Sequence, residues 1–342
     1  MIGPSWVGDM VMAQSLFMVL KQERPERPID LVAPTWALPL AARMPEIRHA
    51  IALPAGHGEL ALAARYRVGI SLRGRHAQAI LLPNSLKSAL VPWFARIPRR
   101  TGFLGELRFG LVNDIRTLDK QRLPRTVQRF VALGLPRDTP LPDSLPVPRL
   151  RASVEEGERI LGVHGLCAEK KLLALCPGAE YGPAKRWPVR HFAALARARI
   201  ASGWRVAVLG SAKERTLGAE ILAGLTDAKA IDPSASGGRD LGGTDAVNLA
   251  GAIDLVAAID VLACAEAVVS NDSGLMHVAA ALDRPGVAIF GSSDPGHTPP
   301  LGTSMRIVSL GLACAPCFKR VCPEGAARCL EEITPERVLE SL

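Results

Sequence analysis

The chain has 342 residues, more than one ordinary domain holds, so we expect two domains. Apolar residues make up 48% of the sequence and can fill two cores, but no apolar run reaches the ~20 residues that a membrane-spanning helix needs. A net charge of +8 favours anionic partners, whereas aromatic residues at 4% argue against a stacking platform for single-stranded nucleic acid.

The excess positive charge lies in the first half. Residues 1–150 contain 21 Lys and Arg against 11 Asp and Glu, whereas residues 151–342 contain 20 against 22. A basic surface attracts anionic lipid, phosphorylated glycan or nucleic acid, and a merely well-solvated surface accounts for the same numbers. No charged segment followed by an apolar signal core opens the chain, so we expect a cytoplasmic protein.

The first half alternates short apolar runs with amphipathic stretches, which predicts β-α-β units around a parallel sheet. The expected elements are helices at 10–20, 38–43 and 85–94 and strands at 29–33, 68–72 and 79–82. Residues 135–150 contain five prolines and no periodicity, which is typical of an extended linker.

The second half repeats this logic with clearer strands. We expect strands at 172–176, 205–209, 267–270 and 286–290, and helices at 191–201, 214–223, 255–264 and 275–282. The fold class is therefore α/β, with two doubly wound Rossmann-like domains facing across a cleft: residues 1–150, residues 151–334, and a closing helix at 335–342. Ligands in such sheets bind beyond the carboxyl ends of the strands, in the loops that lead into helices.

The clearest such loop is the sequence SNDSGLMH, which follows one expected strand and opens the next helix. A helix N-terminus offers unpaired backbone N–H groups to a phosphate, and Gly274 allows a close approach. Alternatively, Asp272 or Ser273 simply caps the helix. His277, one turn further on, either faces a diphosphate or is an ordinary helix histidine.

Two more loops follow strands of the second half. The sequence PGAEYGPAKRWP projects Lys185, a point charge suited to a phosphate, although a solvated Lys-Arg pair beside Trp187 is the alternative. In the other loop, Glu214 accepts hydrogen bonds from ribose hydroxyls or serves as a first-turn helix acid.

The first half has two loops of the same kind. Asp9 follows a glycine-flanked loop, where it is either an N-cap or a functional carboxylate presented into the cleft. The sequence PNSLK presents polar groups that could hold a sugar or phosphate. No His-rich or carboxylate cluster with the spacing of a catalytic metal site occurs, so we expect a mechanism without a metal ion or other cofactor.

The chain contains seven cysteines. Four cluster at the spacing Cys314-x2-Cys317-x4-Cys322-x6-Cys329, and the alternatives are a structural zinc, a conditional disulfide or reduced packing thiols. The other three lie among apolar residues, and we expect them to be buried thiols: Cys167, Cys176 and Cys264.

Together these motifs resemble the lipopolysaccharide heptosyltransferases of glycosyltransferase family 9, which have the GT-B fold. The resemblance covers nearly the whole chain. The segments that carry it are GPSWVGDMVMAQSL (3–16), LPNSLKSALVP (82–92), RRTGFLGELRFGLVND (99–114), PGAEYGPAKRWP (177–188), SNDSGLMHVAAAL (270–282) and the pattern CxPCFKRxC (314–322).

The resemblance implies that the first domain binds the acceptor and the second binds ADP-heptose. Asp9 matches the proposed catalytic base, and Lys185 matches the lysine that contacts the donor phosphate. The other donor positions are Glu214 for the ribose, Ile253 beside the adenine, and the loop residues Asp272, Ser273, Gly274, Leu275 and His277. The acceptor positions that we expect are Asn84, Ser85, Lys87, Arg100 and Arg108.

The sequence departs from the family pattern at two places. Glu180 and Tyr181 stand where other members have threonines just before the lysine, so the diphosphate contacts of that loop differ. Members also usually begin with a full strand before Gly-Pro-Ser-Trp, whereas this chain has only Met1-Ile2. We therefore expect the true start to lie upstream.

The implied reaction is an inverting transfer of heptose from ADP-heptose to the first inner-core heptose of phosphorylated heptosyl-Kdo2-lipid A. The enzyme would work in the cytoplasm, peripheral to the inner membrane and without nucleic acid. One alternative is another family 9 heptosyltransferase that uses the same donor on a different acceptor. The other is a nucleotide-binding or anionic-glycolipid-binding protein without catalysis, which would not need Asp9.

Overall fold

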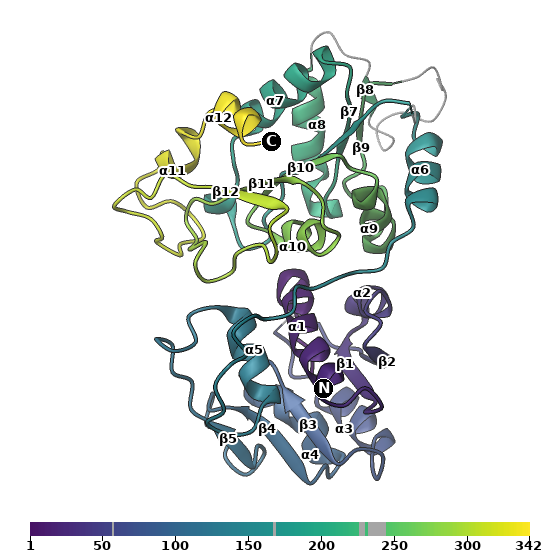
Figure 1. The fold of residues 1–342 in the computed structure, drawn as a ribbon, viewed down its shortest axis with the longest axis vertical. Coiled ribbons are helices and arrows are strands. Elements are labelled where there is room, and N and C mark those ends of the chain that lie inside the picture. The colour runs from purple at the N-terminus through teal and green to yellow at the C-terminus, as the bar shows by residue number, and fades with distance from the viewer. Residues whose placement is uncertain (57, 167–168, 226–229, 232–243) are drawn as a thin grey trace. The chain divides into compact units, whose positions relative to one another are not determined.

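The computed structural model describes residues 1–56, 58–166, 169–225, 230–231 and 244–342. The chain divides into two compact units, Met1–Arg149 and Leu150–Leu342 (Figure 1). Each unit is a set of parallel strands packed with helices, which agrees with the predicted α/β class.

The first unit contains five named strands, all parallel to their neighbours. Two of them pair with each other, and three form a second set. The pair is β1 (Ile29–Pro34) and β2 (Ile47–Leu53), and the set is β3 (Gln78–Leu81), β4 (Arg99–Phe103) and β5 (Asp114–Arg116).

Ile2 joins the two sets of strands. It forms parallel bridges with both Val32 of β1 and Leu81 of β3. Its amide donates to the Ile80 carbonyl at 2.9 Å, and its own carbonyl accepts from the Leu82 amide at 3.1 Å. The segment Met1-Ile2 thus takes the central position of the sheet, where the family pattern has a full strand. The expected upstream start stays a prediction.

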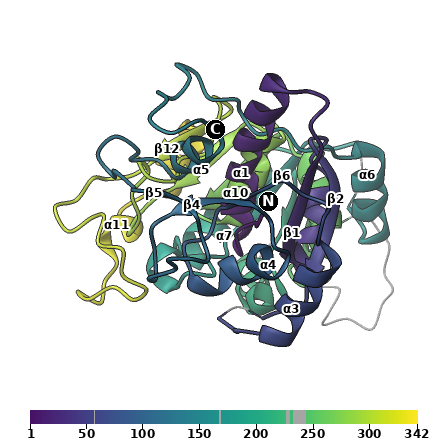
Figure 2. The same cartoon turned by 90° about the horizontal axis from the view of Figure 1, so that it is seen from below.

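Helices of the first unit pack in two pairs. Helix α1 (Val7–Glu23) packs against α5 (Thr126–Gly134), and α3 (Leu62–Ser71) packs against α4 (Leu90–Phe94), as Figures 1 and 2 show. Helix α2 (Leu38–Ala42) follows the 3₁₀ turn η1 (Thr35–Ala37), and the turn η2 (Leu86–Ala89) leads into α4.

The strand predicted at 68–72 is wrong, because these residues lie at the end of α3. The apolar run VGISL suggested a strand. The helical spacing of Ala64, Val68 and Leu72, four residues apart, places all three on one face. Ala64 and Leu72 are buried, and Val68 packs on the core that also contains Val91 of α4.

The proline-rich segment after α5 has no helix or strand, as predicted, but it is anchored. Two polar residues of α1 that are fully buried hold it. The Gln14 side chain donates to the Arg149 carbonyl at 2.7 Å and accepts from the Arg149 amide at 3.0 Å. The Ser15 hydroxyl donates to the Pro146 carbonyl at 2.7 Å. The end of the segment is therefore part of the first unit.

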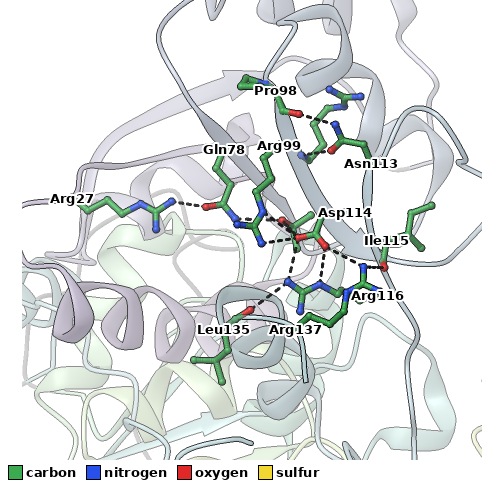
Figure 3. A network of polar contacts seen from close by, with 12 residues as sticks. Arg27, Gln78, Pro98, Arg99, Asn113, Asp114, Ile115, Arg116, Leu135 and Arg137 are labelled. Atoms are coloured by element: carbon green, nitrogen blue, oxygen red, sulfur yellow. Dashed lines mark hydrogen bonds and ion pairs between the residues drawn. The ribbon is translucent and has the colours of Figure 1, made fainter. Parts of the chain in front are cut away.

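A cluster of arginines surrounds Asp114 where the strands of the first unit begin (Figure 3). Arg99, Arg116 and Arg137 form ion pairs with this carboxylate at 3.0, 3.0 and 3.4 Å. Burial opposes the charged form, but hydrogen bonds from Arg116, the Thr101 hydroxyl and Arg99 hold the pKa of Asp114 well below its usual range. Part of the positive excess of the first half is therefore structural.

The second unit is built on one parallel sheet of seven strands in the order β12-β11-β10-β6-β7-β9-β8. The four strands predicted for it are confirmed to within one residue. The strands are β6 (Leu172–Cys176), β7 (Arg205–Val208), β8 (Ala230–Ile231), β9 (Ala246–Asn248), β10 (Ala267–Asn271), β11 (Gly286–Ile289) and β12 (Met305–Val308).

The predicted helices of the second unit are also confirmed, each to within two residues. They are α7 (Val189–Ala201), α8 (Arg215–Ala223), α9 (Leu255–Ala263), α10 (Gly274–Ala281) and the closing helix α12 (Pro335–Glu340). Helix α6 (Val154–Val163) and the short α11 (Arg328–Glu331) were not predicted. The apolar faces of α7, α8 and α12 share one core with the sheet.

Candidate functional site

The strand order of the second unit reverses between β6 and β10. From β6 the chain proceeds to β7 and β9 on one side, then returns to place β10 and β11 on the other. The carboxyl ends of two strands at such a switch point open into diverging loops, which is where doubly wound sheets bind ligands. The loops after β6 and β10 carry the donor motifs.

Lys185 and Asp272 meet at this point. The Lys185 ammonium donates to the Asp272 carboxylate at 2.5 Å, and both side chains are mostly buried. The 3₁₀ turn η3 (Pro183–Lys185) presents the lysine after β6, and Asp272 follows β10 directly. The structure thus brings together two residues 87 positions apart in the sequence.

Asn271 holds the lysine loop in place. Its side chain accepts from the Trp187 amide at 3.0 Å and donates to the Pro177 carbonyl at 2.7 Å, so one residue of β10 ties both ends of the loop. The Trp187 ring is buried and donates to the Ile333 carbonyl at 2.8 Å. Our sequence reasoning did not assign Asn271. The feature of the sequence that could have identified Asn271 is its position between Ser270 and Asp272, at the end of a buried strand.

The N-terminus of α10 lies beside the Lys185–Asp272 pair. Ser273 occupies the N-cap position but makes no side-chain capping bond; its hydroxyl lies 3.2 Å from the Ser270 hydroxyl. Capping therefore does not account for Ser273. Gly274 and Leu275 form the first turn, whose backbone N–H groups have no partner within the helix.

His277 is buried in the first turn of α10. Burial, aided by the charge of Lys185 and opposed by that of Asp272, lowers the pKa of His277 to about 4. The imidazole is therefore neutral at pH 7. It can donate one hydrogen bond to a phosphate oxygen but contributes no positive charge.

Glu214 and Ile253 lie in adjacent loops, after β7 and β9. The Glu214 carboxylate accepts from the Ser211 amide at 2.7 Å as half of a capping box. Glu214 therefore serves as an acid at the start of a helix, which was one of the two predictions for it. A Cβ atom at Gly178 would lie 1.8 Å from this carboxylate, so a side chain there would displace the Glu214 carboxylate from its present position. The predicted ribose contact of Glu214 and the adenine contact of Ile253 stay predictions.

Asp9 lies in the first turn of α1, just beyond the central segment of the first sheet. The helix begins at Val7, with Trp6 as the N-cap, so the N-cap alternative for Asp9 is wrong. The first turn of a helix favours a carboxylate through the helix dipole. Asp9 is partly exposed at the carboxyl edge of this sheet.

The loop after β3 presents the predicted acceptor residues Asn84, Ser85 and Lys87, all at least partly exposed. The buried side chain of Arg108 holds this loop in place through hydrogen bonds. Its guanidinium, only 1% exposed, donates to the carbonyls of Pro83 at 2.7 Å and Phe103 at 2.7 Å. It also donates to the Ser88 hydroxyl at 3.0 Å.

The guanidinium groups of both predicted acceptor arginines donate to backbone carbonyls of the first unit. Burial lowers the pKa of both guanidinium groups. Arg100 donates to the carbonyls of Ile97 at 2.6 Å, Leu111 at 2.6 Å and Gly110 at 3.2 Å. Their contact with an acceptor stays a prediction. The geometry favours Arg108 as a residue that positions the loop.

The four clustered cysteines are free thiols: Cys314, Cys317 and Cys322 lie on the segment between β12 and α11, and Cys329 lies in α11. Burial and then the charges of Cys314, Cys322 and Cys317 raise the pKa of Cys329, so the four sulfurs share one neighbourhood. In the described ranges, no three His, Cys, Asp or Glu side chains are grouped to hold a metal ion. Cys176 and Cys264 are buried as predicted, and Cys167 lies outside the described residues.

Sequence comparison decides the family. The profile of glycosyltransferase family 9 (heptosyltransferase) matches residues 65–328, more than half of the chain. The chain belongs to glycosyltransferase family 9. It is therefore an enzyme of the heptosyltransferase type, as the motifs predicted.

Among the helices of the described residues, none is long and apolar enough to cross a membrane.

Other members of family 9 match over their whole length. Lipopolysaccharide heptosyltransferase 2 of Salmonella typhimurium is 46% identical over 347 residues, with 100% of this chain and 96% of that protein covered. Lipooligosaccharide heptosyltransferase 2 of Haemophilus influenzae is 44% identical over 349 residues, covering 100% and 97%. The solved structure of E. coli ADP-heptose LPS heptosyltransferase II is 43% identical and superposes with a TM-score of 0.84 over 99% and 96% of the chains. The GT-B fold class is thereby confirmed.

Proposed function

We propose that this family 9 enzyme transfers L-glycero-D-manno-heptose from ADP-heptose to the first inner-core heptose of lipopolysaccharide, the reaction of a heptosyltransferase II. The observation that carries the proposal is the Lys185–Asp272 pair at the switch point beside the N-terminus of α10. A cation and a helix N-terminus together form a site for a diphosphate. Identity over the full length to enzymes named heptosyltransferase 2 supports the type.

In the proposed mechanism, Asp9 is the general base. It accepts the proton of an acceptor hydroxyl while that oxygen forms a bond to the anomeric carbon of the donor. The bond from the anomeric carbon to the diphosphate breaks on the opposite face, which inverts the configuration. Asp9 stands in the first turn of α1, where the helix dipole favours a negative charge.

Lys185 and the first turn of α10 stabilise the leaving group. As the glycosidic bond breaks, negative charge gathers on the diphosphate, and fixed donors aimed at that charge lower the barrier. Asp272 holds the lysine until the donor arrives. The neutral His277 adds one hydrogen-bond donor in this region.

The first unit binds the acceptor in this proposal. Asn84, Ser85 and Lys87 contact the sugar and phosphate groups of phosphorylated heptosyl-Kdo2-lipid A. The guanidinium of Arg108 fixes the backbone of their loop. Exposed charges are screened by salt, so salt should weaken acceptor binding more than the binding of the more enclosed donor.

We further propose peripheral contact with the cytoplasmic face of the inner membrane. Large apolar side chains are exposed around the acceptor loop: Leu86, Leu104, Leu107 and Phe109. The Leu86 amide donates to the Glu106 carboxylate at 2.7 Å, so the two segments form one rim. Apolar rims near basic residues bind anionic lipid surfaces. Co-sedimentation with phosphatidylglycerol vesicles should fall for L107S/F109S, and unchanged binding would contradict this contact.

Two alternatives define the test of the function: a family 9 enzyme with another acceptor, and a binding protein without catalysis. The experiment is to incubate the protein with ADP-heptose and a series of truncated core acceptors, then to identify by mass spectrometry which acceptor gains a heptose. Gain only on the acceptor that ends in the first inner-core heptose is expected. Gain on another acceptor indicates the first alternative, and no gain indicates the second.

A further inference from the structure

Two basic side chains from different loops both lie over the ring of Tyr181. The Lys185 ammonium nitrogen is 5.2 Å from the centroid of the Tyr181 ring, and the guanidinium carbon of Arg320 is 5.3 Å from the same centroid. Both positive charges therefore lie within 5.3 Å of the same ring centroid. Cations favour the electron-rich face of an aromatic ring, so the ring fixes both side chains.

Backbone contacts hold Arg320 against the lysine loop. The Tyr181 hydroxyl donates to the Phe318 carbonyl at 2.7 Å, and the Ala184 amide donates to the Arg320 carbonyl at 3.1 Å. A Cβ atom at Gly182 would lie 2.5 Å from that same carbonyl, so this close approach requires glycine. Arg320 is therefore placed by the fold and does not approach Lys185 by chance.

The two cations differ in their charge balance. Lys185 is paired with Asp272, whereas Arg320 is exposed and, in the part of the chain that the structure describes, forms no ion pair with a carboxylate. Two positive charges that lie over one ring repel each other. A ligand with two adjacent negative groups relieves that repulsion, and a guanidinium binds phosphate oxygens through parallel N–H donors.

We propose that Arg320 is a second cation of the donor site and contacts the diphosphate, with the Tyr181 ring, which Lys185 also contacts, holding it in place. The inference rests on the proposed function, because it takes the ligand of this site to be a nucleoside diphosphate sugar. It also assigns a role to Tyr181, which stands where other family members have a threonine. An aromatic ring in that place recruits an arginine from the cysteine-rich segment.

The test is calorimetric titration of the full-length protein with ADP, comparing Arg320→Ala with Lys319→Ala. Lys319 is the adjacent exposed cation of the same segment, and it makes no ring contact with any residue that the structure describes, so it is the matched control. Arg320→Ala should raise the Kd for ADP about tenfold, the effect of losing one charge-assisted contact. Lys319→Ala should leave the Kd within about twofold.

A second readout separates contact from mere structure. The dependence of log Kd on log salt should become shallower in Arg320→Ala, because one fewer charge meets the ligand. Arg320→Lys, which keeps the charge but loses the parallel donors, should recover only part of the affinity. Tyr181→Phe, which keeps the ring, should bind ADP more tightly than Tyr181→Ala.

Each outcome bears on the inference. If the unmodified protein binds ADP and Arg320→Ala behaves like Lys319→Ala, the second cation is refuted. A loss of affinity with an unchanged salt dependence would assign Arg320 a structural role and also refute it. If the unmodified protein does not bind ADP, the proposed function itself fails, which is a distinct result.

Discussion

The two units place family motifs on the same kind of scaffold but use their cations differently. In the second unit, Lys185 lies in the loop that follows β6, with a single carboxylate partner and beside a helix N-terminus. In the first unit, Arg100 lies at the start of β4 and Arg108 follows that strand, yet both guanidinium groups donate to backbone carbonyls of the same unit. A cation in a motif can thus either bind a ligand or build the loop that binds it.

This difference changes how the basic first half is understood. Three of its arginines surround Asp114 at the edge of the sheet where the strands begin (Figure 3). Two more hold loops together. The net charge of this half is therefore a poor measure of how much positive charge an acceptor meets. Lys87 is a better candidate than these arginines for contact with the acceptor.

The largest effect is expected at Asp9, the proposed general base in the first unit. Asp9→Asn should lower turnover by roughly 10²- to 10⁴-fold, because a general base contributes about that much. Its affinity for ADP, measured by calorimetry, should remain unchanged. Asp143→Asn, at an exposed position of the same unit, serves as the control. Full turnover in Asp9→Asn would refute the assignment of the base.

The next effect tests whether Arg108 builds its loop. Arg108→Ala removes donors from several buried carbonyls and should lower the free energy of unfolding by about 3 kcal/mol, measured with urea. Arg122→Ala, at an exposed position, should change it little. If Arg108→Ala were as stable as the control and only weakened acceptor binding, Arg108 would be a ligand contact, and the contrast between the two units would disappear.

A smaller effect comes from His277 in the second unit. Its folded pKa of about 4 lies below the ordinary value of 6.5, so the unfolded chain binds more protons between these values. Stability from the neutral imidazole is complete above pH 6.5 and is lost as the pH falls towards 4. Between pH 7.5 and pH 5 the loss should be about 2 kcal/mol. Urea unfolding of His277→Gln should lack this component; an identical pH dependence would show that His277 is not buried in its neutral form.

Much of the second unit could be predicted from its sequence. Its central strands are continuous apolar runs, because a parallel sheet buries both faces. Local patterns also located Lys185 and the loop at 272–277. They could not show that Asn271 ties both ends of the lysine loop, or that Tyr181 brings Arg320 to it, because these contacts join residues far apart in the chain.

The first unit was harder to predict for physical reasons. Strands β4 and β5 begin with charged residues that are neutralised by each other, as in the Arg99–Asp114 pair, so no apolar run marks them. Helix α3 ends in an apolar run that imitates a strand. The central strand position is filled by Ile2, and only its pairing with β1 and β3 reveals that role.

The most direct test of the account compares the same substitution in the two units, Lys185→Ala and Lys87→Ala, by titration with ADP and by acceptor kinetics. We expect Lys185→Ala to raise the Kd for ADP roughly 10- to 100-fold, whereas Lys87→Ala leaves that Kd unchanged and raises the KM for the acceptor. If Lys87→Ala weakened ADP binding as much as Lys185→Ala, the division of donor and acceptor between the units would be contradicted.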